Sequence, residues 1–350
     1  MSLFTKIQRW IQEEKRYVWI VITLVLLHTT FSLIATLTIP SATAPSPQKE
    51  ALLAEEARLV SALKENESLQ FVLGIGTLLG LLILSFGLFL TIRFVKAKRQ
   101  GKWVIPWRLP DQEVTWTLRD VFHVVVLLVV AGYLIEIFQL LFFQIFKQVP
   151  QNIRLLGGTF LTEVIALYLI FRLVFQKNKT LSHLGLTKNA LSRNLLFGFR
   201  SYVSLLPFLG LTLVLSLWLA EVFNLTPTPQ PIQHLFQEES SQKIFFVGLI
   251  LVLFVGPVVE EIFFRGFLYN ALKAKWGKGW AIFSSGFLFA ILHANLIGLL
   301  PITLLGCTLA YVYALTGSLT ASITIHILHN SIVMAIFFFV THLTKMLGAG

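Results

Sequence analysis

Charged residues are scarce in this chain. Only 13% of its 350 residues are Asp, Glu, Lys or Arg, whereas 56% are hydrophobic. A soluble domain is about a quarter charged and about half apolar. The shortage of charge therefore excludes an ordinary soluble enzyme and indicates a polytopic membrane protein.

The chain has a single cysteine and no convincing internal repeat, and we expect no cleavable leader. Cys307 is the only cysteine, so no intrachain disulfide forms, and its apolar surroundings favour packing over a role as a thiol nucleophile. The lack of a convincing repeat argues against a carrier built from inverted halves. The first apolar run is long and has no small-residue cleavage site, so we expect a membrane anchor there.

Long apolar runs are what the chain has in abundance. Nine of them approach the ~20 residues that a spanning helix needs. They cover residues 17–39, 71–95, 119–146, 157–176, 196–222, 244–272, 279–296, 298–315 and 318–341. We therefore expect an all-α bundle of about eight or nine membrane helices, with the lipid bilayer as its partner.

The net charge of +11 follows from membrane topology rather than from nucleic-acid binding. The basic residues gather in alternate short loops, as the positive-inside rule requires. This pattern places the N-terminus in the cytoplasm and, with nine spans, the C-terminus outside the membrane, which we expect to be a bacterial plasma membrane. The oligomeric state stays open.

The apolar runs suggest two regions. Residues 1–118 are expected to form a two-span region with an outer amphipathic segment at 46–70 and a basic, Trp-rich cytoplasmic linker at 96–118. Residues 119–350 are expected to form a second bundle that carries the chemistry, with every motif between 256 and 331.

Several ionisable and amide side chains interrupt the last apolar runs of this bundle. They are Glu260, Glu261, Arg265, His293, His326 and Asn330. An ionisable side chain near the middle of a membrane helix costs about 2.5–3.5 kcal/mol on insertion scales. Such residues face a protein interior or a wet cavity, so we expect a functional site.

Helical geometry assigns the two acids different roles. Glu261 and Arg265 are four residues apart, so they share a face and can form an ion pair. Glu260 is rotated by about 100° from Glu261 and is left free for chemistry. A helical hairpin that turns near Gly277 brings Glu260 and His293 to one level, each roughly 24 Å from the turn.

The last apolar run presents His326 and Asn330 on one face. His329 shares part of that face and is expected to line the site rather than to react. The turn at 317–318 lies only about 13 Å before His326. This distance predicts that His326 is shallower than His293, unless the turn is re-entrant.

These residue types suit peptide hydrolysis by an activated water. Glu260 can act as the general base, His293 can hold or polarise the water, and His326 with Asn330 can donate hydrogen bonds to the oxyanion. Glu260, His293 and His326 also form a possible ligand set for a catalytic divalent metal such as zinc. Because the His-Glu-x-x-His motif is absent, both a metal-dependent and a metal-free site stay open.

The spacing of these residues resembles the CAAX-processing and bacteriocin-processing (CPBP) family of intramembrane proteases, which includes the type II CAAX prenyl endopeptidases. The matching motifs are Glu260-Glu261-x-x-x-Arg265, Phe289-x-x-x-His293 and His326-x-x-x-Asn330. The resemblance covers about 180–340. It implies a membrane-associated peptide or protein substrate, a cavity open to the cytosol, catalysis by Glu260, His293, His326 and Asn330, and support from Glu261, Arg265 and Phe289. The family is described as metalloproteases.

Two other functions fit the same residues. A non-proteolytic adaptor or bacteriocin-immunity protein would keep the motifs for its fold, and an ion or solute carrier would use them as a coupling site. His28, His123, Glu136 and Glu163 stand alone in other runs, where an interhelical hydrogen bond is the expected role.

Overall fold

The computed structural model describes residues 14, 17, 19, 20, 23, 66–102, 105–110, 113–145, 149–225, 235–236 and 241–348. The elements in these residues are helices, which confirms the predicted all-α fold class. Most of the first apolar run and residues 46–65 of the predicted outer segment lie outside the described residues.

Seven helices in the described residues are long and apolar enough to cross a membrane. They are α4 (Glu67–Arg99), α5 (Leu118–Ile145), α6 (Gln151–Gln176), α7 (Leu191–Val222), a long rod that begins at Gln242, α12 (Leu299–Thr316) and α13 (Leu319–Gly348). The rod folds back at Gly277, where φ is 79°. The sixth and seventh predicted runs are therefore the two arms of the expected hairpin.

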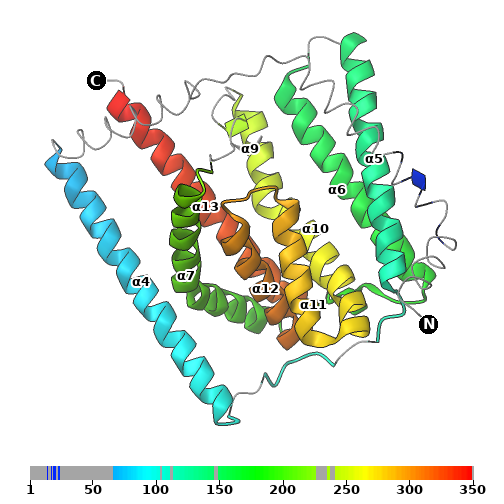
Figure 1. Cartoon of the computed structure of the whole chain (residues 1–350), viewed down its shortest axis with the longest axis horizontal. Coiled ribbons are helices and arrows are strands. Elements are labelled where there is room, and N and C mark those ends of the chain that lie inside the picture. Colours follow the sequence, from blue (N-terminus) through cyan, green and yellow to red (C-terminus); the bar gives the residue numbers. More distant parts are fainter. Residues whose placement is uncertain are drawn as a thin grey trace.

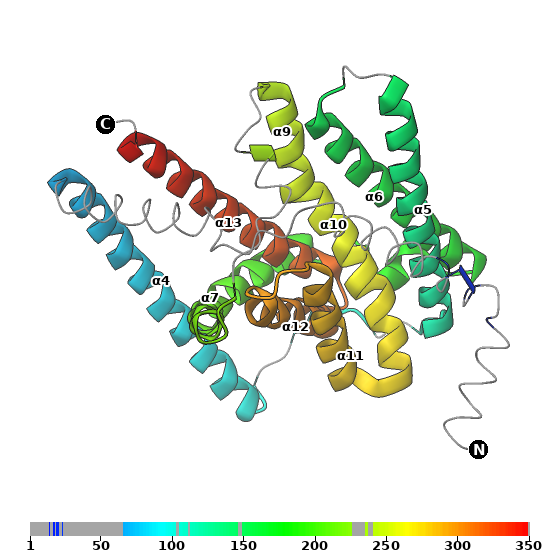
Figure 2. The same ribbon diagram turned by 45° about the horizontal axis from the view of Figure 1, so that its top comes forward.

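The helices are arranged as a central group with a flank on each side. In both ribbon views α4 lies at one edge and α5 with α6 at the opposite edge (Figures 1 and 2). The rod, α7, α12 and α13 lie between them. The largest buried apolar cluster joins the rod to α5, α6, the end of α12 and the start of α13, and Glu261 and Arg265 of the rod are fully buried beside it.

The first arm of the rod alternates between α-helical and π-helical turns. It consists of α9 (Gln242–Ile250), η2 (Leu251–Val255), α10 (Gly256–Glu261), η3 (Ile262–Tyr269) and the start of α11 (Asn270–Leu292), with η2 and η3 π-helical. Side chains donate to carbonyls of η3 from around it: Ser285 to Phe264, Asn270 to Gly266 and Trp116 to Phe267. Such π-helical turns are often found at functional sites.

Glycine allows α11 and α12 to approach closely. A Cβ atom at Gly306 would lie 2.7 Å from the carbonyl oxygen of Gly286, and a Cβ atom at Gly286 would clash with the backbone of Cys307. Glycine at both positions therefore removes the steric barrier between the two backbones. The contact brings the carbonyl oxygen of Gly306 within reach of Arg265.

The turn between α12 and α13 is recessed inside the protein. The backbone N–H of Leu109 donates to the carbonyl of Thr316, and that of Leu319 donates to the carbonyl of Gly185, both at 2.9 Å. Ser318 and Leu319 are fully buried. Chain segments before α5 and before α7 thus cover this turn, and α13 begins below the surface.

Candidate active site

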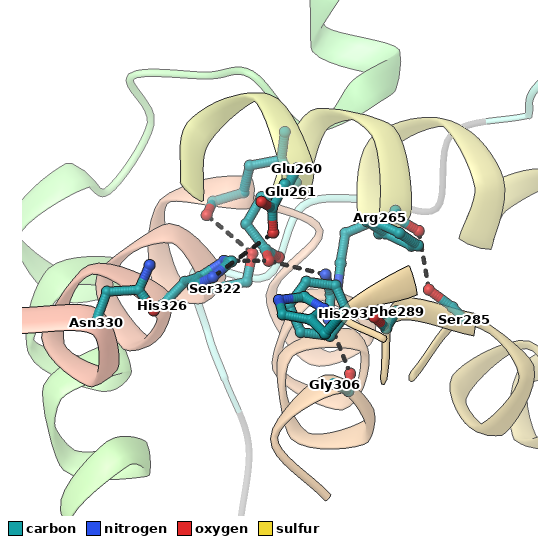
Figure 3. Close-up of polar contacts among 12 residues, drawn as sticks. Glu260, Glu261, Arg265, Ser285, Phe289, His293, Gly306, Ser322, His326 and Asn330 are labelled. Carbon is teal, nitrogen blue, oxygen red and sulfur yellow. Dashed lines mark hydrogen bonds and ion pairs between the residues drawn. The ribbon is translucent and has the colours of Figure 1, made fainter. Parts of the chain in front are cut away.

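Glu261 is the centre of the polar cluster. Its Oε1 lies 2.8 Å from Arg265 Nη1 and 3.0 Å from His326 Nδ1, and its side chain is completely buried. Arg265 also donates from Nη2 to the carbonyl of Gly306 at 3.1 Å and stacks over the Phe289 ring at 4.6 Å. The expected Glu261–Arg265 pair is present, and the buried cation has partners on three helical segments (Figure 3).

His326 faces two carboxylates at once. The carboxylate of Glu261 can only accept a hydrogen bond, so Nδ1 of His326 carries the hydrogen of this contact. The other ring nitrogen, Nε2, faces Glu260. This Nε2 lies 3.8 Å from Oε2 of Glu260. The side chain of His326 is 3% exposed and that of Glu260 is 40% exposed. The Glu260 side chain is therefore partly exposed, whereas its Oε2 atom, which faces His326, is buried and has no hydrogen-bond partner among the described residues.

Phe289 links His293 to the cluster. The Nδ1 atom of His293 lies 2.7 Å from the carbonyl oxygen of Phe289, which can only accept. Nδ1 of His293 therefore donates to this carbonyl, which fixes the orientation of the ring. The Phe289 ring lies 4.5 Å from the His293 ring and 5.5 Å from the His326 ring, measured between centroids.

These ring contacts correct the depth expected for His326. Its distance from the turn placed it shallower than His293, yet both imidazoles contact the same Phe289 side chain. The reason is the recessed turn between α12 and α13: counting residues from it starts inside the protein rather than at its surface. The turn before α13 is therefore re-entrant, and this is the condition under which His326 is not expected to be shallower than His293.

Asn330 and His329 follow His326 on α13. The Nδ2 atom of Asn330 donates to the carbonyl of Val252 in η2 at 3.0 Å, so its amide is anchored to the rod. His329 faces α7 instead, with Nδ1 3.5 Å from the hydroxyl of Tyr202. This long contact suits a lining residue better than a reacting one.

Glu163 on α6 is a site residue that the sequence pattern did not reveal. A Cβ atom placed on Gly256 would lie 3.5 Å from Oε1 of Glu163 and 3.9 Å from Oε1 of Glu260. The two carboxylates therefore face the same glycine. Oε2 of Glu163 is buried and has no hydrogen-bond partner. We expected an interhelical hydrogen bond for Glu163, but the structure places it next to the acid of the motif. Glu163 lies some hundred residues before that acid, with no motif of its own.

The arrangement of donors bears on the possible metal. In the part of the chain that the structure describes, no three His, Cys, Asp or Glu side chains gather closely enough to hold an ion. Glu260 and His326 approach one another, whereas His293 reaches them through the Phe289 ring. The described donors thus do not fit a three-ligand site, and the mechanism below uses only groups of the chain itself.

Comparison with known proteins agrees with the motif spacing. Residues 242–332 match the family model described as type II CAAX prenyl endopeptidase Rce1-like. A Bacillus subtilis (strain 168) protein named "Putative membrane peptidase YdiL" is 37% identical over 86 residues. That match covers 25% of this chain and 35% of the relative, so the chain spans about a third of the curated relative's length. No solved structure matches the chain.

The matched segment contains all of the ionisable residues of the three motifs. It begins at the start of α9 and ends just after Asn330, so it covers the rod, α12 and the first half of α13. Residues 242–332 of this integral membrane protein are therefore similar to the Rce1-like type II CAAX prenyl endopeptidases.

Proposed function

We propose that the chain is an intramembrane endopeptidase in which Glu260 activates a water molecule. The observation that carries this proposal is the position of Glu260: it is part-exposed and lies beside the Nε2 atom of a buried imidazole. A carboxylate inside a membrane bundle is costly unless it is used. The family of the segment and the name of its relative both support peptide-bond hydrolysis.

The gap between Glu260 and His326 suits a bridging water. At 3.8 Å, Oε2 and Nε2 are too far apart for a direct hydrogen bond, and such a separation is commonly bridged by water. Glu260 removes a proton from this water while the oxygen attacks the scissile carbonyl. The same carboxyl then returns the proton to the leaving amine, as general acid–base catalysis requires.

His326 and Asn330 are the proposed donors to the oxyanion. Glu261 holds Nδ1 of His326, so Nε2 points toward the site, and a proton taken up there from water supplies the Nε2–H donor. The amide of Asn330 has two N–H bonds, and the one that Val252 does not use is left for the substrate oxygen. Donors fixed before the reaction stabilise the tetrahedral intermediate without reorganising.

His293 is proposed to hold the attacking water from the other side. Its tautomer is set by the carbonyl of Phe289, so Nε2 accepts a hydrogen bond. An acceptor of this kind orients the water and raises its electron density toward the carbonyl. The substrate is proposed to be a membrane-associated protein or peptide, of the CAAX type or of a peptide-maturation type.

The test uses the full chain reconstituted in lipid vesicles. Quenched fluorogenic peptides are supplied with and without a prenylated C-terminal cysteine, which separates the two substrate types. Glu260→Gln should lower turnover by about 10²- to 10⁴-fold, the range for loss of a general base. The exposed Glu113 supplies the matched control, and Glu113→Gln should cleave like the parent.

Other outcomes of the same test would favour the rival functions. Equal cleavage by the parent and Glu260→Gln, with both proteins folded, would overturn the assignment. If cleavage is absent and ion or solute flux depends on Glu260, the chain is a carrier. If neither activity depends on Glu260, an adaptor or immunity role gains support.

A further inference from the structure

A large groove lies outside the catalytic cluster, between α4, α7 and α12. Its volume is about 1050 Å³, at the upper end of the range for small-molecule sites. The lining side chains are mostly apolar and aromatic, such as Phe86, Phe89, Leu90 and Phe208. We call this space the α4–α7 groove. Two of its walls, α4 and α7, precede the segment that matches the peptidase family, and the third wall, α12, lies within that segment.

Two contacts join α4 to the other walls of the groove. α4 crosses α7 where a Cβ atom at Gly87 would clash with the backbone of Val203, and the hydroxyl of Thr91 donates to the carbonyl of Ser204 at 3.1 Å. Nearer the end of α4, Lys98 Nζ lies 2.9 Å from the hydroxyl of Tyr311 on α12.

Two cations line the groove. Arg93 comes from α4 and Arg200 from α7, and both side chains are exposed. Among the described residues that line the groove there is no Asp or Glu. An arginine within a membrane-spanning helix is costly unless an anion or the interface satisfies it. The charge of the groove therefore suits a negative partner, and its walls suit an apolar one.

We propose that the α4–α7 groove binds one anionic phospholipid. The phosphate lies between Arg93 and Arg200, whose guanidinium groups match a phosphate with paired N–H donors. The acyl chains lie along the aromatic side chains toward the crossing at Gly87. The site gives α4 a role: a bound lipid fills the space between this peripheral helix and the peptidase bundle.

The position of the cations supports a lipid. Arg93 is six residues from the C-terminal end of α4, roughly 9 Å along its axis, and Arg200 is nine residues from the start of α7, roughly 14 Å. Both lie toward the ends of the helices that carry the basic loops. Basic side chains in this position attract anionic headgroups.

The experiment measures lipid retention by the full chain. The protein is incubated with phosphatidylcholine vesicles that contain phosphatidylglycerol and is then extracted in mild detergent. Native mass spectrometry measures the mass of the protein with any lipid that stays bound. The parent should retain one phosphatidylglycerol in preference to phosphatidylcholine. Arg93→Gln/Arg200→Gln should retain it about thirtyfold less well, the product expected from two cation contacts at a membrane surface.

Two further variants make the result specific. Arg172→Gln/Lys275→Gln removes the same charge elsewhere and should retain lipid like the parent, which distinguishes the groove from general attraction. Leu90→Trp fills the groove, keeps both arginines and should lose the lipid. Thermal unfolding checks that each variant is folded.

Three results would overturn the proposal. The first is that Arg93→Gln/Arg200→Gln retains as much phosphatidylglycerol as Arg172→Gln/Lys275→Gln. The second is that the parent retains as much phosphatidylcholine as phosphatidylglycerol. The third is that the parent retains no lipid other than lipid that detergent exchanges freely. None of these readouts involves cleavage, so the lipid site and the proposed peptidase activity fail or stand separately.

Discussion

Arg265→Met should unfold the protein more readily than any exposed charge substitution. Arg265 and Glu261 are both fully buried and 2.8 Å apart, so the substitution leaves a buried carboxylate without its cation. Breaking a buried pair in this way costs about 3–5 kcal/mol. The same change removes the donor to the carbonyl of Gly306, which is part of that loss.

The double variant Glu261→Leu/Arg265→Met separates charge from packing. Replacing both partners by apolar side chains is often neutral or stabilising by about 1–4 kcal/mol. His326 then loses the acceptor for Nδ1, which costs about 1–3 kcal/mol. The double variant should therefore recover most of the stability that the single variant loses. It should not recover cleavage, because the imidazole is no longer held.

Reversible unfolding in mixed detergent micelles measures these free energies. The control is Lys177→Met, which removes the cation of a part-exposed pair with Asp120 and should cost at most about 1 kcal/mol. The reasoning is refuted if Arg265→Met is as stable as this control. It is also refuted if the single and double variants are equally destabilised, since the pair would then have no coupling energy.

Three other substitutions test the remaining contacts. Asn330→Val should lower turnover about 10²- to 10³-fold, the effect of losing one oxyanion donor, while peptide binding measured with an uncleaved analogue stays within a fewfold of the parent. Glu163→Leu should raise the unfolding free energy, because it removes a buried oxygen without a hydrogen-bond partner. It should also slow cleavage, because an apolar side chain beside Glu260 excludes water from that carboxylate. His329→Phe should leave both turnover and melting temperature near those of the parent, because its hydrogen bond is long.

Much of the fold is predictable because lipid imposes simple rules. Apolar length locates membrane helices, and the runs from 71 onward all appear as helices. Helical spacing likewise predicts the Glu261–Arg265 pair, since residues four apart share a face. These features depend only on local sequence.

Contacts between helices are less accessible to the same reasoning. The contact between Glu261 and His326 joins residues 65 positions apart, and neither periodicity nor spacing encodes it. Spacing alone does not decide the depth of His326, because other chain segments cover the turn before α13. Glu163 was assigned a structural role because its helix carries no motif, yet packing of α6 against α10 brings it beside Glu260.

Glu260 is proposed to activate water for peptide cleavage. A comparison of membrane-protein termini in living cells is the decisive test of this role. Cells that produce equal amounts of the folded parent or of Glu260→Gln are compared by mass spectrometry of membrane-protein termini. We expect at least one membrane-associated protein or peptide whose new terminus appears with the parent and is lost with Glu260→Gln. Identical sets of termini from the two cell populations would contradict it.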